Sequence, residues 1–246
     1  MTRNNTQTSH YAYIDFLRTV SIVLVILLHC IGGYLFDSAN IGKTLWVMTA
    51  YANEVCRIGV PLFFMMSGFL LLNKKIDSVG AFYKHRFLKI ALPFLLYDTF
   101  YYLFLPSGNE PRSFVGWLRE LINNGSAYHL WFIYSILILY LFVPFIRKIT
   151  EKCTTGELIL FLLLCTFQTT LKPLYNILFS EKAYLYLSDD GFVGYLGYML
   201  LGYILGKTDI PRKIRVLLYT CGLLSLAFCP IIVMNALREG RGVWLN

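Results

Sequence analysis

Long apolar stretches recur along this chain of 246 residues, and they constrain its fold more than any other feature. A helix that crosses a bilayer needs about 20 consecutive, mainly apolar residues. Hydrophobic residues make up 57% of the chain and charged residues 15%, which argues against a soluble domain. We predict an all-α fold, a polytopic transmembrane helix bundle of about seven spans. The spans are expected at roughly 13–36, 45–73, 87–105, 130–149, 158–178, 192–206 and 214–237.

Proline and glycine modify three of these spans. Pro61 is expected to interrupt the second span, and Pro93 to kink the third. Gly202 and Gly206 have the GxxxG spacing that favours close helix packing. Two polar segments link spans: 106–128, with a short surface helix expected around Trp117, and 180–191.

Lys and Arg set the expected orientation. The short segments on the N-terminal side of the bundle carry more of them than the opposite side, so residues 1–12 are predicted to be a cytoplasmic tail. Residues 13–246 then form the transmembrane domain. The net charge of +8 is distributed in short runs between spans, as in cytoplasmic loops, so nucleic acid is not an expected partner.

The first span carries Asp15, Arg18 and His29, which are costly in lipid and usually face a protein interior or a wet cavity. Eleven residues at 100° each bring His29 to within about 20° of Arg18, roughly 16 Å along the axis. A neutral His can act as a general base. Alternatively, His29 is a polar core residue bonded to a neighbouring helix. Arg18 suits either an anionic ligand group or a salt bridge to Asp15.

Other polar residues allow two interpretations each. Glu54 and Arg57, three residues apart, form a packing clamp or part of a polar cavity. His129 is a site residue or an interfacial side chain that reaches water. Asp98 has no partner evident in the sequence, so we expect it to line a cavity. The basic stretch from Tyr83 to Lys89 is a lipid anchor or a dock for donor phosphates. No metal-ligand spacing and no GxSxG, Walker or HxxxxD motif occurs.

Several motifs in order resemble the acyltransferase family 3 membrane proteins over nearly the whole chain. The first is the Arg-x10-His element from Arg18 to His29. Within this family, the chain resembles the branch that contains the inner-membrane O-acetyltransferase of enterobacterial common antigen. The other matching motifs are Arg57-Ile-Gly-Val-Pro61 with Ser67-Gly68-Phe69, His85-Arg86-Phe-Leu-Lys89 with Pro93, Tyr128-His129-Leu-Trp131 with Pro144, and Tyr198-Met-Leu-Leu-Gly202 with Gly206.

This resemblance implies a multi-pass enzyme of the bacterial inner membrane. Such enzymes transfer an acyl group, usually acetyl from acetyl-CoA, to a hydroxyl of a surface or lipid-linked glycan. No bound cofactor is implied, because acyl-CoA is a co-substrate. By the same resemblance His29 is the catalytic base, Arg18 is its essential partner, and Arg86 and Lys89 face the donor. Relatives usually carry about ten spans, so we expect this chain to lack the last spans, about three by the 20-residue rule.

Two alternatives accompany this interpretation. Polar residues within spans also suit a transporter or flippase for a glycan or lipid precursor, although no inverted repeat is evident. A shortened family member without activity is the second alternative. The sequence leaves the acceptor, the acyl group and the oligomeric state open.

Overall fold

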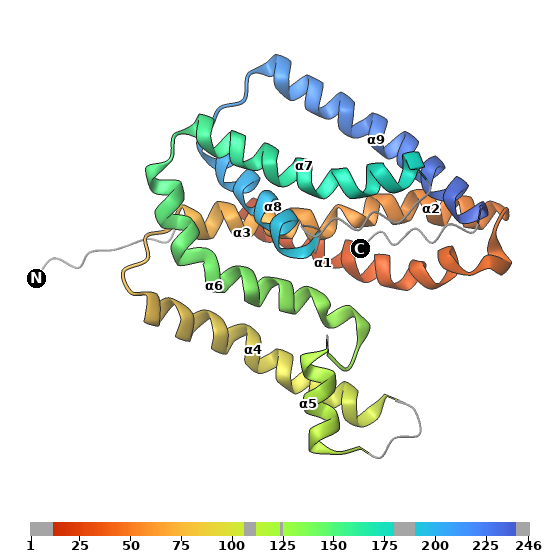
Figure 1. The fold of residues 1–246 in the computed structure, drawn as a ribbon, viewed down its shortest axis with the longest axis horizontal. Helices are drawn as coiled ribbons and strands as arrows, with labels where there is room; N and C mark the ends of the chain where they lie inside the picture. Colours follow the sequence, from red (N-terminus) through yellow and green to blue (C-terminus); the bar gives the residue numbers. More distant parts are fainter. Residues whose placement is uncertain (1–11, 106–111, 124, 180–189, 240–246) are drawn as a thin grey trace, which may run out of the picture. The chain divides into compact units, whose positions relative to one another are not determined.

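A computed structural model describes residues 12–105, 112–123, 125–179 and 190–239 (Figure 1). These residues form nine α-helices and two short 3-10 helices, and none of them lies in a strand, so the all-α prediction is confirmed. The chain divides into two units. The first comprises residues 1–66 and 208–246, and the second comprises residues 67–207. Residues 1–11 of the predicted tail (1–12) and 180–189 of the predicted linker (180–191) lie outside the described residues.

Five helical segments within the described residues are long and apolar enough to cross a membrane. They coincide with the first, second, third, fourth and seventh predicted spans. The segments are α1 (Ala12–Phe36), α2 with α3 (Thr44–Leu72), α4 (Val79–Phe104), α6 (Trp131–Lys152) and α9 (Arg212–Arg238). The fifth and sixth predicted spans form helices α7 (Thr155–Phe179) and α8 (Asp190–Lys207), which are not among the five. The total of seven spans and the cytoplasmic N-terminus stay predictions.

The second span is interrupted shortly before Pro61, as predicted. Helix α2 ends at Arg57, and α3 (Gly59–Leu72) begins two residues later. The ring of a helical proline clashes with the carbonyl group four residues earlier, which for Pro61 belongs to Arg57. Pro61 therefore sits in the first turn of α3, where a missing N–H costs little. Pro93, in contrast, lies inside the continuous helix α4.

In the first unit, α1 and α2 form a helical hairpin, and α9 packs on α2. Their common core consists of Leu35, Trp46, Ala50 and Met234, all at most 7% exposed. The Trp46 indole N–H donates to the Leu35 carbonyl at 2.9 Å. The Arg238 guanidinium lies over the Trp46 ring, 5.5 Å from its centre, as in cation–π contacts. This core fixes the end of the hairpin where α1 turns into α2.

In the second unit, α8 is the most buried helix, packed between α6 and α7. Met199, Leu200 and Tyr203 are at most 1% exposed. Glycines allow the close approach, and the predicted packing role is confirmed at Gly206: a methyl group there would overlap the Phe69 ring. At Gly68 a methyl group would overlap the Met199 backbone itself. Here α3 and α8 touch backbone to backbone.

We expect Gly68→Ala to destabilise the chain by about 1–3 kcal/mol, because the backbones of α3 and α8 must separate to admit the methyl group. Gly222→Ala in α9 is the matched control. Nothing lies within 4 Å of the methyl group there, and alanine favours the helix by about 1 kcal/mol. Thermal unfolding of the purified protein in detergent measures both. Equal stability of the two variants would contradict the α3–α8 contact.

Candidate functional site

Helix α1 is continuous from Ala12 to Phe36, so Arg18 and His29 lie on one face, as predicted. Buried Ile14 and Ser21 border this face, and both Arg18 and His29 are half-buried. The Arg18 guanidinium and the Asp15 carboxylate approach to 3.6 Å, with 40% and 50% of these side chains exposed. The predicted Asp15–Arg18 salt bridge is therefore present. An exposed pair of this kind contributes at most about 1 kcal/mol, which leaves Arg18 able to bind an anionic ligand group.

Contacts of α1 with α2 and with the start of α3 show at which level of α1 each turn of α2 lies. Trp46 bonds to Leu35, and a methyl group on Gly59 would lie 2.9 Å from the Ser21 carbonyl oxygen. In this antiparallel arrangement α2 passes the level of His29 near residues 51–52. The following turn of α2, at 54–57, then lies at levels of α1 between His29 and Arg18.

That turn of α2 carries a polar cluster. The Arg57 Nε atom and the Glu54 Oε1 atom are 3.6 Å apart, and the Asn53 amide donates to the same oxygen at 3.3 Å. Only 25% of the Arg57 side chain and 14% of the Glu54 side chain are exposed. Removing one partner of such a pair leaves a poorly solvated charge. The contact is compatible with both interpretations of this pair, a packing clamp and part of a polar cavity.

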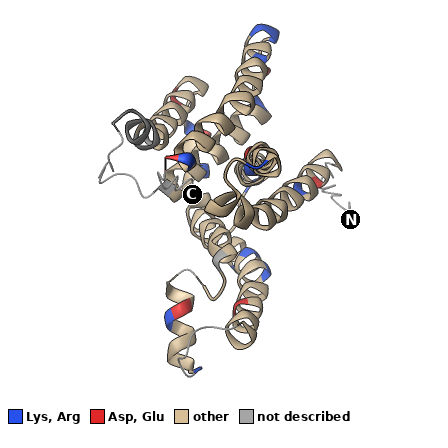
Figure 2. Cartoon of the chain, turned by 90° about the vertical axis from the view of Figure 1, so that its right-hand side faces the viewer, with Lys and Arg blue, Asp and Glu red and all other residues tan. Residues whose placement is uncertain are grey.

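We call Arg18, His29, Glu54 and Arg57 the polar layer of the first unit. Figure 2 shows charged residues as short patches on helices that are otherwise uncharged. Within the described residues, no group of three or more His, Cys, Asp or Glu side chains has a metal-binding arrangement. An imidazole can transfer protons and a guanidinium can bind anionic groups, so the side chains of the layer offer both kinds of chemistry.

The remaining predicted site residues belong to the second unit. His129 lies in the 3-10 turn Tyr128–Leu130 and is exposed; its ring meets the Tyr101 ring edge-on, with centres 5.0 Å apart. Arg86 and Lys89 lie in the first half of α4. The first unit thus contains Asp15, Arg18, His29, Glu54 and Arg57. The second unit contains Arg86, Lys89 and His129.

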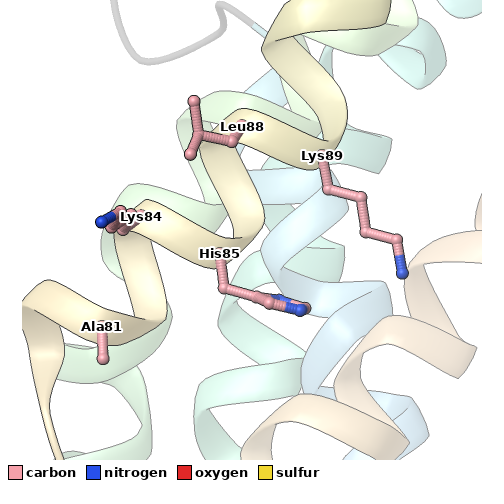
Figure 3. Close-up of a pocket in the computed structure, with 5 residues that line it drawn as sticks. All are labelled: Ala81, Lys84, His85, Leu88 and Lys89. Atoms are coloured by element: carbon pink, nitrogen blue, oxygen red, sulfur yellow. The ribbon is translucent and has the colours of Figure 1, made fainter.

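The basic start of α4 borders an open groove of about 520 Å³. Its lining residues include Lys84, His85 and Lys89, and Figure 3 shows His85 and Lys89 on the same side of the helix. Arg86, which was predicted to act with Lys89, is not among the lining residues. Lys84 and Leu88 are four residues apart, and so are His85 and Lys89. Residues with this spacing share one face of a helix, so this face could be predicted from the sequence.

Asp98 corrects a prediction. We expected it to line a cavity, but it is wholly buried and bonded to the protein. Its carboxylate accepts hydrogen bonds from the Trp117 indole N–H at 2.9 Å, the Ser126 backbone N–H at 2.7 Å and the Ser126 hydroxyl at 3.3 Å. Gly125 has a φ of +85°, and a methyl group there would lie 3.0 Å from the carboxylate. Asp98 therefore holds the segment that leads to His129.

Comparisons with known proteins agree with these features. The family model described as an acyltransferase domain (Acyl_transf_3) matches residues 11–240. An "Amino-acid racemase" of Enterococcus faecalis is 26% identical over 139 residues, which are 54% of this chain and 18% of the relative. A "Serine/alanine racemase" of Enterococcus gallinarum is 30% identical over 134 residues, 50% of this chain and 18% of the relative.

The matched segments thus span less than a fifth of the length of these two relatives. No solved structure matches the chain. The family model, in contrast, covers all five segments that could cross a membrane, together with the polar layer. The chain therefore belongs to the acyltransferase domain family, as a membrane protein with several spans.

Proposed function

We propose that this protein is an integral membrane O-acyltransferase that moves acetyl from acetyl-CoA to a hydroxyl of a cell-surface or lipid-linked polysaccharide. The proposed location is the inner membrane of a bacterium. The observation that carries the proposal is the shared face of Arg18 and His29 on a membrane-crossing helix, inside the region matched by the acyltransferase family. A half-buried imidazole there is available to a substrate that enters the bundle.

In the proposed reaction the acceptor hydroxyl oxygen attacks the carbonyl carbon of the thioester. His29 takes the hydroxyl proton as the new C–O bond forms, and the C–S bond then breaks to release CoA. The proton passes from His29 to the departing thiolate, so the enzyme returns to its starting state. Holding the two substrates in one site supplies much of the rate enhancement, because the reaction within the complex needs no further encounter.

The neighbouring charges have assigned roles in this proposal. Arg18 binds an anionic or polarised oxygen of the substrates, and Asp15 holds the guanidinium by the salt bridge at 3.6 Å. Glu54 and Arg57 support the face of α1 from α2. Arg18→Lys keeps the charge but loses the planar fork of donors, so it should restore only part of the activity lost in Arg18→Ala.

Lys89 is proposed to bind the phosphates of acetyl-CoA at the groove on α4. Lys89→Ala should raise the KM for acetyl-CoA about 10-fold, the equivalent of one charge-assisted hydrogen bond, with a smaller change in kcat. Lys75→Ala is the matched control, since Lys75 is also exposed and precedes α4. Equal KM values for the two variants would favour a lipid anchor instead.

Two measurements test the function itself. Mass spectrometry of surface glycans from cells with and without the gene reports acetylation, and purified protein mixed with acetyl-CoA and glycan reports release of free CoA thiol. Loss of glycan acetylation with the gene, and thiol release that depends on the acceptor, are expected. Acetylation that is unchanged in cells without the gene would exclude this protein as the enzyme.

A transporter is the second candidate, because polar residues within the spans also suit a translocation path. The two relatives are both named for amino-acid racemisation, and each shares about half of this chain. The polar layer could then pass a small polar molecule, such as an amino acid, or the glycan precursor considered above. Uptake of labelled serine or alanine into vesicles that contain the protein, without acetyl transfer, would support this candidate over the enzyme.

A further inference from the structure

Helix α5 (Phe114–Ile122) is a short helix held across the C-terminal end of α4 (Figure 1). Tyr102, in the last turn of α4, accepts a hydrogen bond from the Ser113 backbone N–H at 3.1 Å and donates to the Ser113 carbonyl at 3.0 Å. Trp117 donates to buried Asp98 one turn earlier on α4. The Tyr134 hydroxyl of α6 donates to the Leu121 carbonyl. These bonds fix both the position and the rotation of α5.

The fixed rotation turns one side of α5 toward the protein and a second, apolar side away from it. Trp117 and Leu121, four residues apart, face α4 and α6. The polar residues Arg119 and Glu120 lie on a third side. The remaining side chains occupy an arc of about 100° and are largely exposed: Phe114 73%, Val115 68%, Leu118 40% and Ile122 74%.

Helix α5 is attached near the end of α4 that lies opposite the basic start of that helix. Helix α4 has 26 residues and is about 39 Å long, whereas the hydrocarbon core is about 30 Å thick. Asp98 and Tyr102, which hold α5, lie about 29 and 35 Å from the start of α4 by helical rise. Tyr101, Tyr102 and Trp117 are at this level, where aromatic residues are typical of the membrane interface.

We propose that α5 is a membrane-interface helix, whose apolar side of Phe114, Val115, Leu118 and Ile122 inserts into the lipid leaflet at the C-terminal end of α4. The occupant of this surface is lipid, because the apolar surface continues onto a membrane-crossing helix: Phe100, Leu103 and Phe104 at the end of α4 are 54%, 46% and 69% exposed. A helix with one apolar side and one charged side lies in the interface plane.

Photocrosslinking of the whole chain in phospholipid vesicles tests this placement. p-Benzoylphenylalanine is introduced in place of Phe114 or Ile122 on the apolar side, and in place of Glu120 on the charged side as the matched control. A third position, Leu223 of α9, which is 70% exposed on a membrane-crossing helix, serves as the lipid-facing reference. After illumination, mass spectrometry identifies what is attached to each site.

We expect lipid adducts at Phe114 and Ile122 in yields near that of Leu223 and several-fold above that of Glu120. Adducts to a second protein chain at Phe114 and Ile122, or equal lipid yields on the two sides of α5, would overturn the proposal. As a second readout, Ile122→Asp should speed proteolysis after Arg119 in vesicles several-fold, whereas Glu120→Gln should not. Unchanged proteolysis of Ile122→Asp would also count against insertion.

Discussion

Replacing His29 by alanine should lower acetyl transfer about 10²–10⁴-fold, the usual contribution of a general base. The proposed reaction requires a group that accepts the hydroxyl proton while the C–O bond forms, and His29 is the imidazole of the polar layer. Within that layer Arg18 and Arg57 stay protonated and cannot accept the proton, and the Glu54 carboxylate is held by Arg57 and Asn53. Release of free CoA thiol by purified protein, with glycan as acceptor, measures the effect on kcat.

Two further variants separate catalysis from structure. His29→Gln keeps a polar side chain for a neighbouring helix but cannot take a proton, so it should be as inactive as His29→Ala. Cys30→Ala, at the next residue of α1 and exposed, should leave turnover within about twofold, as for surface changes away from a site. If His29→Gln keeps its activity, the polar core interpretation of His29 is the correct one.

The positions of the spans could be predicted because the bilayer imposes a length on apolar helices. Five of the predicted segments form helices that are long and apolar enough to cross a membrane, and the break before Pro61 follows from proline geometry alone. Helices α7 and α8 show the limit of this reasoning. Five glycines and three tyrosines lower the apolar character of α8, yet it is the most buried helix of its unit, because glycine permits close packing.

The candidate site could also be predicted only in part. Helical periodicity placed Arg18 and His29 on one face, and spacing of three residues placed Glu54 beside Arg57. Neither rule predicts contacts between residues that are far apart in the sequence. The partners of Asp98 lie 19 and 28 residues away, within the polar segment 106–128, so no periodicity connects them. The groove on α4 is lined by Lys89 but not by Arg86, a difference that the sequence pattern did not predict.

Asp98→Ala should destabilise the second unit by about 2–5 kcal/mol, because it removes the acceptor of three hydrogen bonds in a fully buried place. The Trp117 indole N–H and the Ser126 backbone N–H would be left without this acceptor, and α5 would lose one of its attachments to α4. Thermal unfolding in detergent measures the loss. Glu120→Ala, an exposed acidic residue of α5, is the control and should change stability by less than about 0.5 kcal/mol.

A double-mutant cycle assigns part of this loss to a single hydrogen bond. Trp117→Phe keeps an aromatic ring but removes the donor to Asp98, so it should cost about 1.5–3 kcal/mol, as for a bond to a charged group. In Asp98→Ala/Trp117→Phe the two losses should not add, and the coupling should be about 0.5–3 kcal/mol. Strictly additive losses would mean that Asp98 stabilises the unit without binding Trp117. The same result would remove one of the attachments that orient α5.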